Sequence, residues 1–138
     1  MSDKINNIKN DIEGYDRLSD IDIGKIVDVD DGYAYIIAKH SKNKIKTNQI
    51  RKFFDVIKKI EKSDDDWNTK RVQFYLLKPR LANAFGRKRI TKEFYDVIIA
   101  AMNIVDIEGD PEVSQKNFEY FVNLYESIIA YHKYFGGQ

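Results

Sequence analysis

The sequence predicts an all-α fold, a compact bundle of about five helices. Apolar residues recur at steps of three and four over most of the chain from residue 47 onward, which is the spacing of one helical face. Residues typical of helix starts and ends bound the same stretches. With 138 residues, 43% of them hydrophobic, the chain is long enough for one domain with a buried core, which we place at residues 19–138.

The first 37 residues carry the weakest pattern. Residues 1–18 have only a thin apolar stripe, so we predict a tail or a frayed helix there. The stripe consists of Ile5, Ile8, Ile12 and Tyr15. Two apolar runs on either side of Asp31 and Gly32 are compatible with a β-hairpin. We prefer a short helix after Gly32, because a single hairpin would have no sheet to join.

A basic amphipathic helix is predicted after Thr47, which is a candidate N-cap. Its apolar side consists of Ile50, Phe53, Phe54, Ile57 and Ile60. Its opposite side carries Arg51, Lys52, Asp55, Lys58, Lys59 and Lys62. A helix with this pattern packs on the core through its apolar side and leaves its cations in solvent.

The next helix begins near Trp67 or Thr69, after three aspartates whose charge suits the first turn of a helix. Pro79 removes a backbone donor from its interior, so we expect the helix to kink there or to stop and restart. Gly86 suits a left-handed helix end. One side carries Phe74, Leu77, Leu81 and Phe85, and the other carries Val72, Tyr75 and Leu76. Such a helix is either central to the bundle or also contacts a partner.

Two further helices complete the predicted bundle. Thr91 can cap the first of them, which Gly109 ends. The second starts at Asp110 and Pro111, an N-cap followed by a proline at the first helical position, and runs to Phe135. Its apolar arc is broader than one neighbouring helix would cover. It is therefore either packed between several helices or in contact with a second protein.

The charges are segregated along the chain, although they nearly cancel to a net charge of +1. Residues 38–62 hold nine cations and two acids, and residues 70–92 hold eight cations and no acid. The segments at both ends of the chain are acidic. The two basic segments either form one basic face that meets a polyanion or are interleaved by the fold into an ordinary solvated surface.

The sequence predicts no catalytic site, no metal site and no cofactor. His40 and His132 are the only histidines, and His132 falls on an apolar helical side, where a hydrogen-bonded core histidine is expected. The acids around Gly32 resemble a calcium loop, but Val27 and Val29 occupy positions that require carboxylates. Cysteine is absent, and so are the glycine loops and nucleophile motifs of known enzyme classes. We therefore expect that the protein is not an enzyme.

The chain has no apolar run of membrane length and no apolar segment typical of a secretory signal at its amino terminus. Together with the absence of cysteine, this predicts a cytoplasmic protein without a membrane partner.

Three stretches, in this order, resemble a known family. They are residues 47–54 (TNQIRKFF), 77–87 (LKPRLANAFGR) and 121–133, which end in IIAYHK. The family is the small helical subunit of type III-A CRISPR effector complexes, the Csm assembly, and the resemblance covers roughly residues 45–135. That family usually has Lys-Pro-Lys-Leu-Ala-Tyr in the second stretch. Here Arg80 keeps the charge, whereas Asn83 replaces the aromatic residue, so no stacking role is carried over to Asn83.

The resemblance implies an all-α subunit without catalytic activity of its own. Its copies would stack beside the repeated backbone subunits and steady the duplex of guide RNA and target RNA. Target cleavage would belong to the backbone subunit, and signalling and DNA cleavage to the large subunit. The residues expected to contact phosphates are Arg51, Lys52, Lys78, Arg80, Arg87, Lys88 and Arg89.

A second hypothesis is a helical adaptor that binds only proteins. In that case the broad apolar arc of the last helix would be the working surface, and the cations would only keep the protein in solution. A third, a small nuclease or metal-dependent hydrolase, is disfavoured because the ligand spacing around Gly32 fails.

Overall fold

The structure is a computed structural model that describes residues 2–137. Within this range the chain forms seven α-helices, one short 3-10 helix and no strand. They are α1 (Ser2–Glu13), η1 (Leu18–Asp20), α2 (Ile23–Val27), α3 (Tyr33–Ser41), α4 (Thr47–Lys62), α5 (Trp67–Gly86), α6 (Lys92–Met102) and α7 (Pro111–Tyr134). The all-α prediction is confirmed, but the helix number was underestimated, because α1 falls in the stretch predicted as a tail or frayed helix and α2 is too short to show a clear period.

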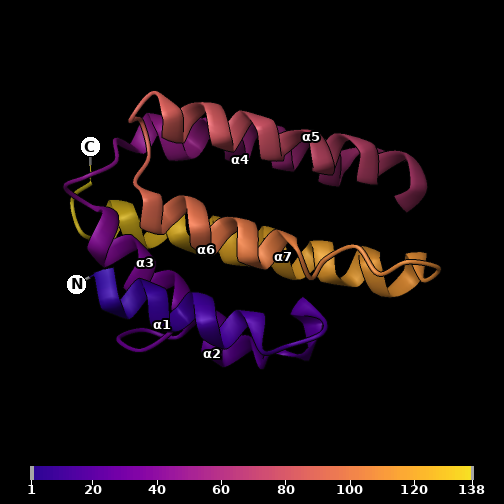
Figure 1. Ribbon diagram of the computed structural model, residues 1–138, viewed down its shortest axis with the longest axis horizontal. Coiled ribbons are helices and arrows are strands. Elements are labelled where there is room, and N and C mark those ends of the chain that lie inside the picture. Colours follow the sequence, from indigo (N-terminus) through magenta and orange to yellow (C-terminus); the bar gives the residue numbers. More distant parts are fainter. Residues whose placement is uncertain (1, 138) are drawn as a thin grey trace.

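The helices lie in three layers (Figure 1). The antiparallel pair α4 and α5 forms one side, α6 and α7 lie in the middle, and α1 to α3 form the other side. No helix among residues 2–137 has both the length and the apolar character that a membrane span requires.

The central helix is α7, which packs against α2, α3, α4, α5 and η1. Its broad apolar arc is therefore packed between several helices, one of the two predicted arrangements. Tyr125, in the middle of α7, is fully buried, and its hydroxyl donates a hydrogen bond of 2.8 Å to the carbonyl oxygen of Ile50 in α4. Burial raises the pKa of this phenol well above its usual value, so it remains a neutral donor.

The amino-terminal region belongs to the core. Ile5, Ile8 and Ile12 of α1 are buried, and α1 packs against α6 and α3. This stretch is a core helix, and not the tail or frayed helix that the sequence suggested. The preferred helix after Gly32 is confirmed as α3, so the hairpin alternative is wrong.

The helix that contains Pro79 does not stop and restart, since α5 is continuous from Trp67 to Gly86. The proline deprives the carbonyl of Tyr75 of its helical donor. Tyr75 is exposed, so water can satisfy that carbonyl and the helix tolerates the proline.

Two of the predicted N-caps are confirmed by hydrogen bonds. Thr91 Oγ1 accepts from the amide of Phe94 at 3.2 Å, and Asp110 Oδ1 accepts from the amide of Val113 at 3.2 Å. The predicted cap at Thr47 is wrong, because α4 has Lys46 at that position. The hydroxyl of Thr47 instead lies 3.1 Å from His132 Nδ1.

Candidate nucleic-acid interface

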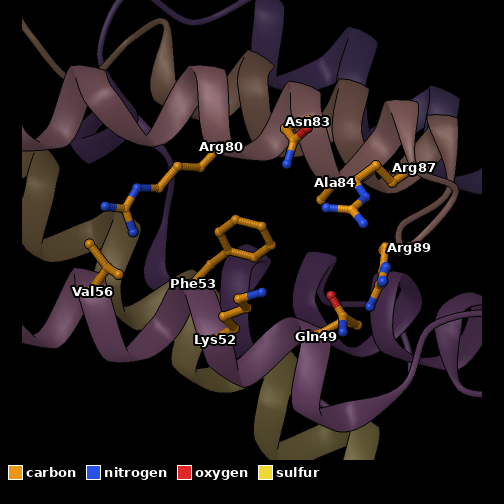
Figure 2. Close-up of a pocket in the computed structure, with 9 residues that line it drawn as sticks. All are labelled: Gln49, Lys52, Phe53, Val56, Arg80, Asn83, Ala84, Arg87 and Arg89. Atoms are coloured by element: carbon orange, nitrogen blue, oxygen red, sulfur yellow. The ribbon is translucent and has the colours of Figure 1, made fainter.

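A cleft of 260 Å³ lies between α4 and the carboxyl-terminal half of α5 (Figure 2). Nine residues line it: Gln49, Lys52, Phe53, Val56, Arg80, Asn83, Ala84, Arg87 and Arg89. We refer to this hollow as the cleft throughout.

Residues on one side of α4 form one wall of the cleft. Gln49, Lys52, Phe53 and Val56 follow each other at steps of three, one and three, so they share one side of the helix. Phe53 lies between the two helices and is only 6% exposed. The wall therefore combines a buried aromatic ring with a cation and an amide beside it.

The other wall comes from α5 and from the turn that follows it. Arg80, Asn83 and Arg87 recur at steps of three and four and lie on one side of the helix axis. The sequence predicts a left-handed helix end at Gly86, but the left-handed residue is Lys88, with φ 61°. That conformation costs about 1 kcal/mol in a residue with a Cβ.

The strained turn positions Arg89. The amide of Arg89 donates to the carbonyl oxygen of Ala84 at 2.8 Å, and the amide of Lys88 donates to that of Phe85 at 2.9 Å. These bonds satisfy carbonyls at the end of α5 and fold the chain back, so that Arg89 lines the cleft together with Arg87.

Four cations from two separate segments thus converge on the cleft: Lys52, Arg80, Arg87 and Arg89. No carboxylate lines the cleft, and none of the four forms an ion pair with another residue in the part of the chain that the structure describes. Figure 2 shows the guanidinium groups of Arg87 and Arg89 directed into the space between the helices. Such a cluster is self-repelling on its own, and an anion relieves the repulsion.

The other three predicted phosphate contacts lie outside the cleft. Arg51 is exposed on a different side of α4 from Lys52, because successive residues are rotated by about 100°. Lys78 donates to Asn103 Oδ1 at 3.0 Å, and its Nζ lies 5.0 Å from the ring centre of Tyr75. Lys88 is exposed at the turn and does not line the cleft.

Two of the polar lining residues were not predicted as site residues. Gln49 and Asn83 contribute neutral amide side chains to the two opposite walls. Amides can donate hydrogen bonds to phosphate or sugar oxygens. The helical spacing of Gln49 from Lys52, and of Asn83 from Arg80, was the signal that could have identified them.

A different arrangement occupies the amino-terminal half of α5. Asp106, which follows α6, accepts hydrogen bonds from Trp67 Nε1 at 2.9 Å, from Arg71 Nε and Nη2 at 2.9 and 2.7 Å, and from the Tyr75 hydroxyl at 2.9 Å. We call these four residues the Asp106 network. Burial alone would raise the pKa of Asp106, but the hydrogen bonds from Arg71, Trp67 and Tyr75 outweigh it and lower the pKa below its usual value.

The chemistry of the cleft suits a polyanion better than a reaction. It offers cations and amides, but neither a carboxylate nor a histidine that could act as a general base. Its one aromatic ring, Phe53, is buried and cannot stack on a base. The cleft can therefore hold phosphates without reading the sequence of the strand.

The chain was compared with protein families, curated proteins and solved structures. The family model described as Csm2 Type III-A matches residues 25–138, which is most of the chain. No curated protein and no solved structure matches.

Proposed function

The chain belongs to the Csm2 Type III-A family, and from this premise we propose that it steadies guide RNA and target RNA through sequence-independent contacts between the cleft and the RNA backbone. The family comprises the small, non-catalytic structural subunit of type III-A CRISPR effector complexes, so the chain assembles with other Csm subunits. The proposal extends to antiviral defence in the cytoplasm, beside the backbone and large subunits and further copies of the chain.

The observation that supports this proposal is the convergence of unpaired cations. Lys52 comes from α4, whereas Arg80, Arg87 and Arg89 come from α5 and its terminal turn, with no acid between them. Each phosphate that such a cation neutralises releases condensed counterions, which provides affinity that falls as salt rises. Arginine also presents a planar fork of donors that matches phosphate oxygens.

Two further predicted contacts flank the cleft. Arg51 and Lys88 are exposed and adjacent in sequence to lining cations, so we propose that they contact RNA that extends beyond the cleft. Lys78 is a weaker candidate, because it is already bonded to Asn103.

The test measures RNA binding by fluorescence anisotropy at low and high salt. Replacing Arg80, Arg87 and Arg89 together by alanine removes three cations from the cleft. We expect affinity for an RNA duplex to fall at least tenfold, and the slope of log affinity against log salt to fall by about 2 to 3. Circular dichroism should show unchanged helicity, because all three side chains are exposed.

A matched variant controls for the loss of charge alone. Lys9, Lys25 and Lys116 lie away from the cleft, and the first two form surface ion pairs of small energetic value. Replacing them by alanine should change binding much less. Equal losses in the two triple variants, equal affinity of the wild type at low and high salt, or no binding at either would contradict the proposal.

A second candidate function, contact with a protein partner, is favoured by the exposed apolar side of α5. Val72, Tyr75 and Leu76 are 52%, 40% and 51% exposed and lie at helical spacing. We propose that another Csm subunit covers this side, rather than the apolar arc of α7, which is packed within the bundle.

The two surfaces can be separated by experiment. Replacing Leu76 by aspartate should reduce co-purification with the other Csm subunits and leave the RNA affinity of the free chain within twofold. Replacing Val29, which is 59% exposed elsewhere, by aspartate is the control. Normal assembly of the Leu76 variant would rule out this side of α5 as the subunit contact.

A further inference from the structure

A second basic hollow, of 390 Å³, lies close to the cleft and plays no part in the proposed function. Residues 42–46, which connect α3 to α4 and which we call the lysine loop, form most of it. The lining residues are Lys42, Asn43, Lys44, Ile45, Lys46 and Gly136.

The lysines of this loop are available to a ligand. Lys42, Lys44 and Lys46 form no ion pair within the part of the chain that the structure describes, and no carboxylate lines the hollow. Tyr35 packs against Phe135 near the loop, and the acid beside Tyr35 is Asp30. Asp30 does not line the hollow. Three unpaired lysines on five consecutive residues make a strongly positive surface.

The lysine loop is anchored to the core through Ile45. Ile45 is buried, and its carbonyl oxygen lies 2.9 Å from Nε2 of the buried His132. A carbonyl only accepts, so Nε2 is the donor, and Nδ1 is left to accept from the Thr47 hydroxyl at 3.1 Å. The loop is therefore ordered before any ligand arrives, which lowers the entropic cost of binding.

An exposed aromatic ring is connected to this loop through Phe135. Tyr134, the last residue of α7, is 72% exposed. Its ring meets Phe135 edge-on at 5.2 Å between centres, and Lys42 Nζ lies 5.5 Å from the centre of the Phe135 ring. Lys42 thus contacts the Phe135 ring, which in turn contacts the exposed ring of Tyr134, whereas the cleft has only the buried Phe53.

The hollow and the cleft are neighbours along one helix. Lys46 lines the hollow and Gln49 lines the cleft, and they are separated by about 4.5 Å along the axis of α4. The α3–α4 connection and the carboxyl terminus also lie at the same end of the molecule (Figure 1).

We propose that the lysine loop and Tyr134 form a second site, which binds a single-stranded segment of nucleic acid by backbone contacts and by stacking of a base on Tyr134. The proposal rests on the proposed function in one respect: the cleft must bind RNA if one strand is to continue from the cleft into the hollow. Single-stranded bases are free to stack on an exposed ring, whereas bases inside a duplex are not. The segment is therefore unpaired.

The test compares three labelled probes by anisotropy on the full-length chain: an oligouridine of about 12 nucleotides, an abasic strand of the same length and an RNA duplex. Replacing Tyr134 by alanine should weaken oligouridine binding about fivefold or more and leave the other two probes unchanged. Replacing Tyr134 by phenylalanine keeps the ring and should keep the affinity.

The lysines are tested separately. Replacing Lys42, Lys44 and Lys46 by alanine should lower the salt slope for both single strands by about 2. The control variant, with Lys9, Lys25 and Lys116 replaced by alanine, should keep the wild-type slope.

The outcomes separate this inference from the proposed function. If the arginine variant of the cleft loses duplex binding while the Tyr134 and lysine-loop variants bind every probe as the wild type does, only the second site is refuted. If oligouridine binding requires Tyr134 while the arginine variant of the cleft binds the RNA duplex as the wild type does, the second site stands and the proposed function fails. An equal loss of abasic-strand binding in Tyr134→Ala would refute stacking. Capture by phosphatidylserine vesicles that the lysine-loop variant abolishes, with RNA binding unchanged, would assign the loop to a membrane and overturn the inference.

Discussion

The two halves of α5 use arginine in opposite ways. In the amino-terminal half, Arg71 directs two nitrogens at Asp106, and Trp67 and Tyr75 complete the set of donors around that carboxylate. In the carboxyl-terminal half and directly after it, Arg80 and Arg87 line the cleft without an acidic partner. Arginine has the same intrinsic chemistry at all three positions, so the presence or absence of a carboxylate decides its role.

The charge of Arg71 therefore serves the fold, whereas the charges of Arg80 and Arg87 are available for binding. An arginine bound to a carboxylate joins two elements of the fold, and its charge is already compensated before a ligand arrives. An unpaired arginine leaves the fold slightly destabilised by repulsion, and an external anion removes that repulsion. The Asp106 network thus holds α5 to the segment after α6, while the cleft remains open to a polyanion.

Removing the carboxylate of the network should have the largest effect on stability. We expect Asp106→Ala to lower the free energy of unfolding by about 2–3 kcal/mol, because it leaves the buried Trp67 N–H without an acceptor and the Arg71 charge without a partner. Urea denaturation followed by circular dichroism measures this. Glu108→Ala, at an exposed acid two residues away, should change stability by less than about 0.5 kcal/mol. Similar losses in both variants would show that Asp106 has no special role.

The contribution of Asp106 to stability should also depend on pH. The pKa of Asp106 is lowered in the folded state, so its stabilising effect is complete above the unfolded value of about 3.9 and is lost as the pH falls through the folded value. The wild type should therefore lose more stability than Asp106→Asn when the pH falls below about 4. Parallel loss in the two proteins in urea titrations would contradict this assignment.

Replacing one arginine in each half of α5 by glutamine tests whether the two halves have different roles. Arg71→Gln should destabilise the fold by a fraction of the Asp106 effect and leave RNA affinity unchanged. Arg80→Gln should leave stability unchanged and weaken RNA binding about tenfold, through the loss of one charged contact. Urea denaturation and RNA anisotropy on both variants complete the test. If both variants lose stability, or both lose RNA affinity, the two halves of α5 are not functionally distinct.

Long helices and their caps could be predicted from the sequence. The apolar spacing predicted α4, α5, α6 and α7, and Thr91 and Asp110 cap as expected, because these signals are local. The helix α3 was predicted only by rejecting a hairpin that would have had no sheet to join, and α2 has too few turns to show a period. The role of α1 was missed because its stripe is thin, and the core position of its isoleucines depends on distant helices.

The cleft could be predicted only in part. The two basic segments were visible in the sequence, but helical rotation removes Arg51 from the cleft, and Asn103 engages Lys78. Gly86 predicted the end of the helix, but the left-handed residue is Lys88, and this position brings Arg89 into the cleft. Asp106 lies 35 residues from Arg71, so sequence alone could not show which arginine has a carboxylate partner.

Introducing a carboxylate into the cleft should have only a small effect on stability. Asn83 lies between Arg80 and Arg87 at helical spacing, so Asn83→Asp creates acid–arginine neighbours that stabilise the helix by about 0.3 kcal/mol. RNA affinity should fall about tenfold and the salt slope by about one, because the new carboxylate competes with phosphate for the same donors. Asn68→Asp changes the net charge equally at the other end of α5 and should leave RNA affinity almost unchanged. RNA anisotropy on both variants decides the matter: an equal loss would mean that the net charge of the molecule, and not the unpaired arginines of the cleft, governs binding.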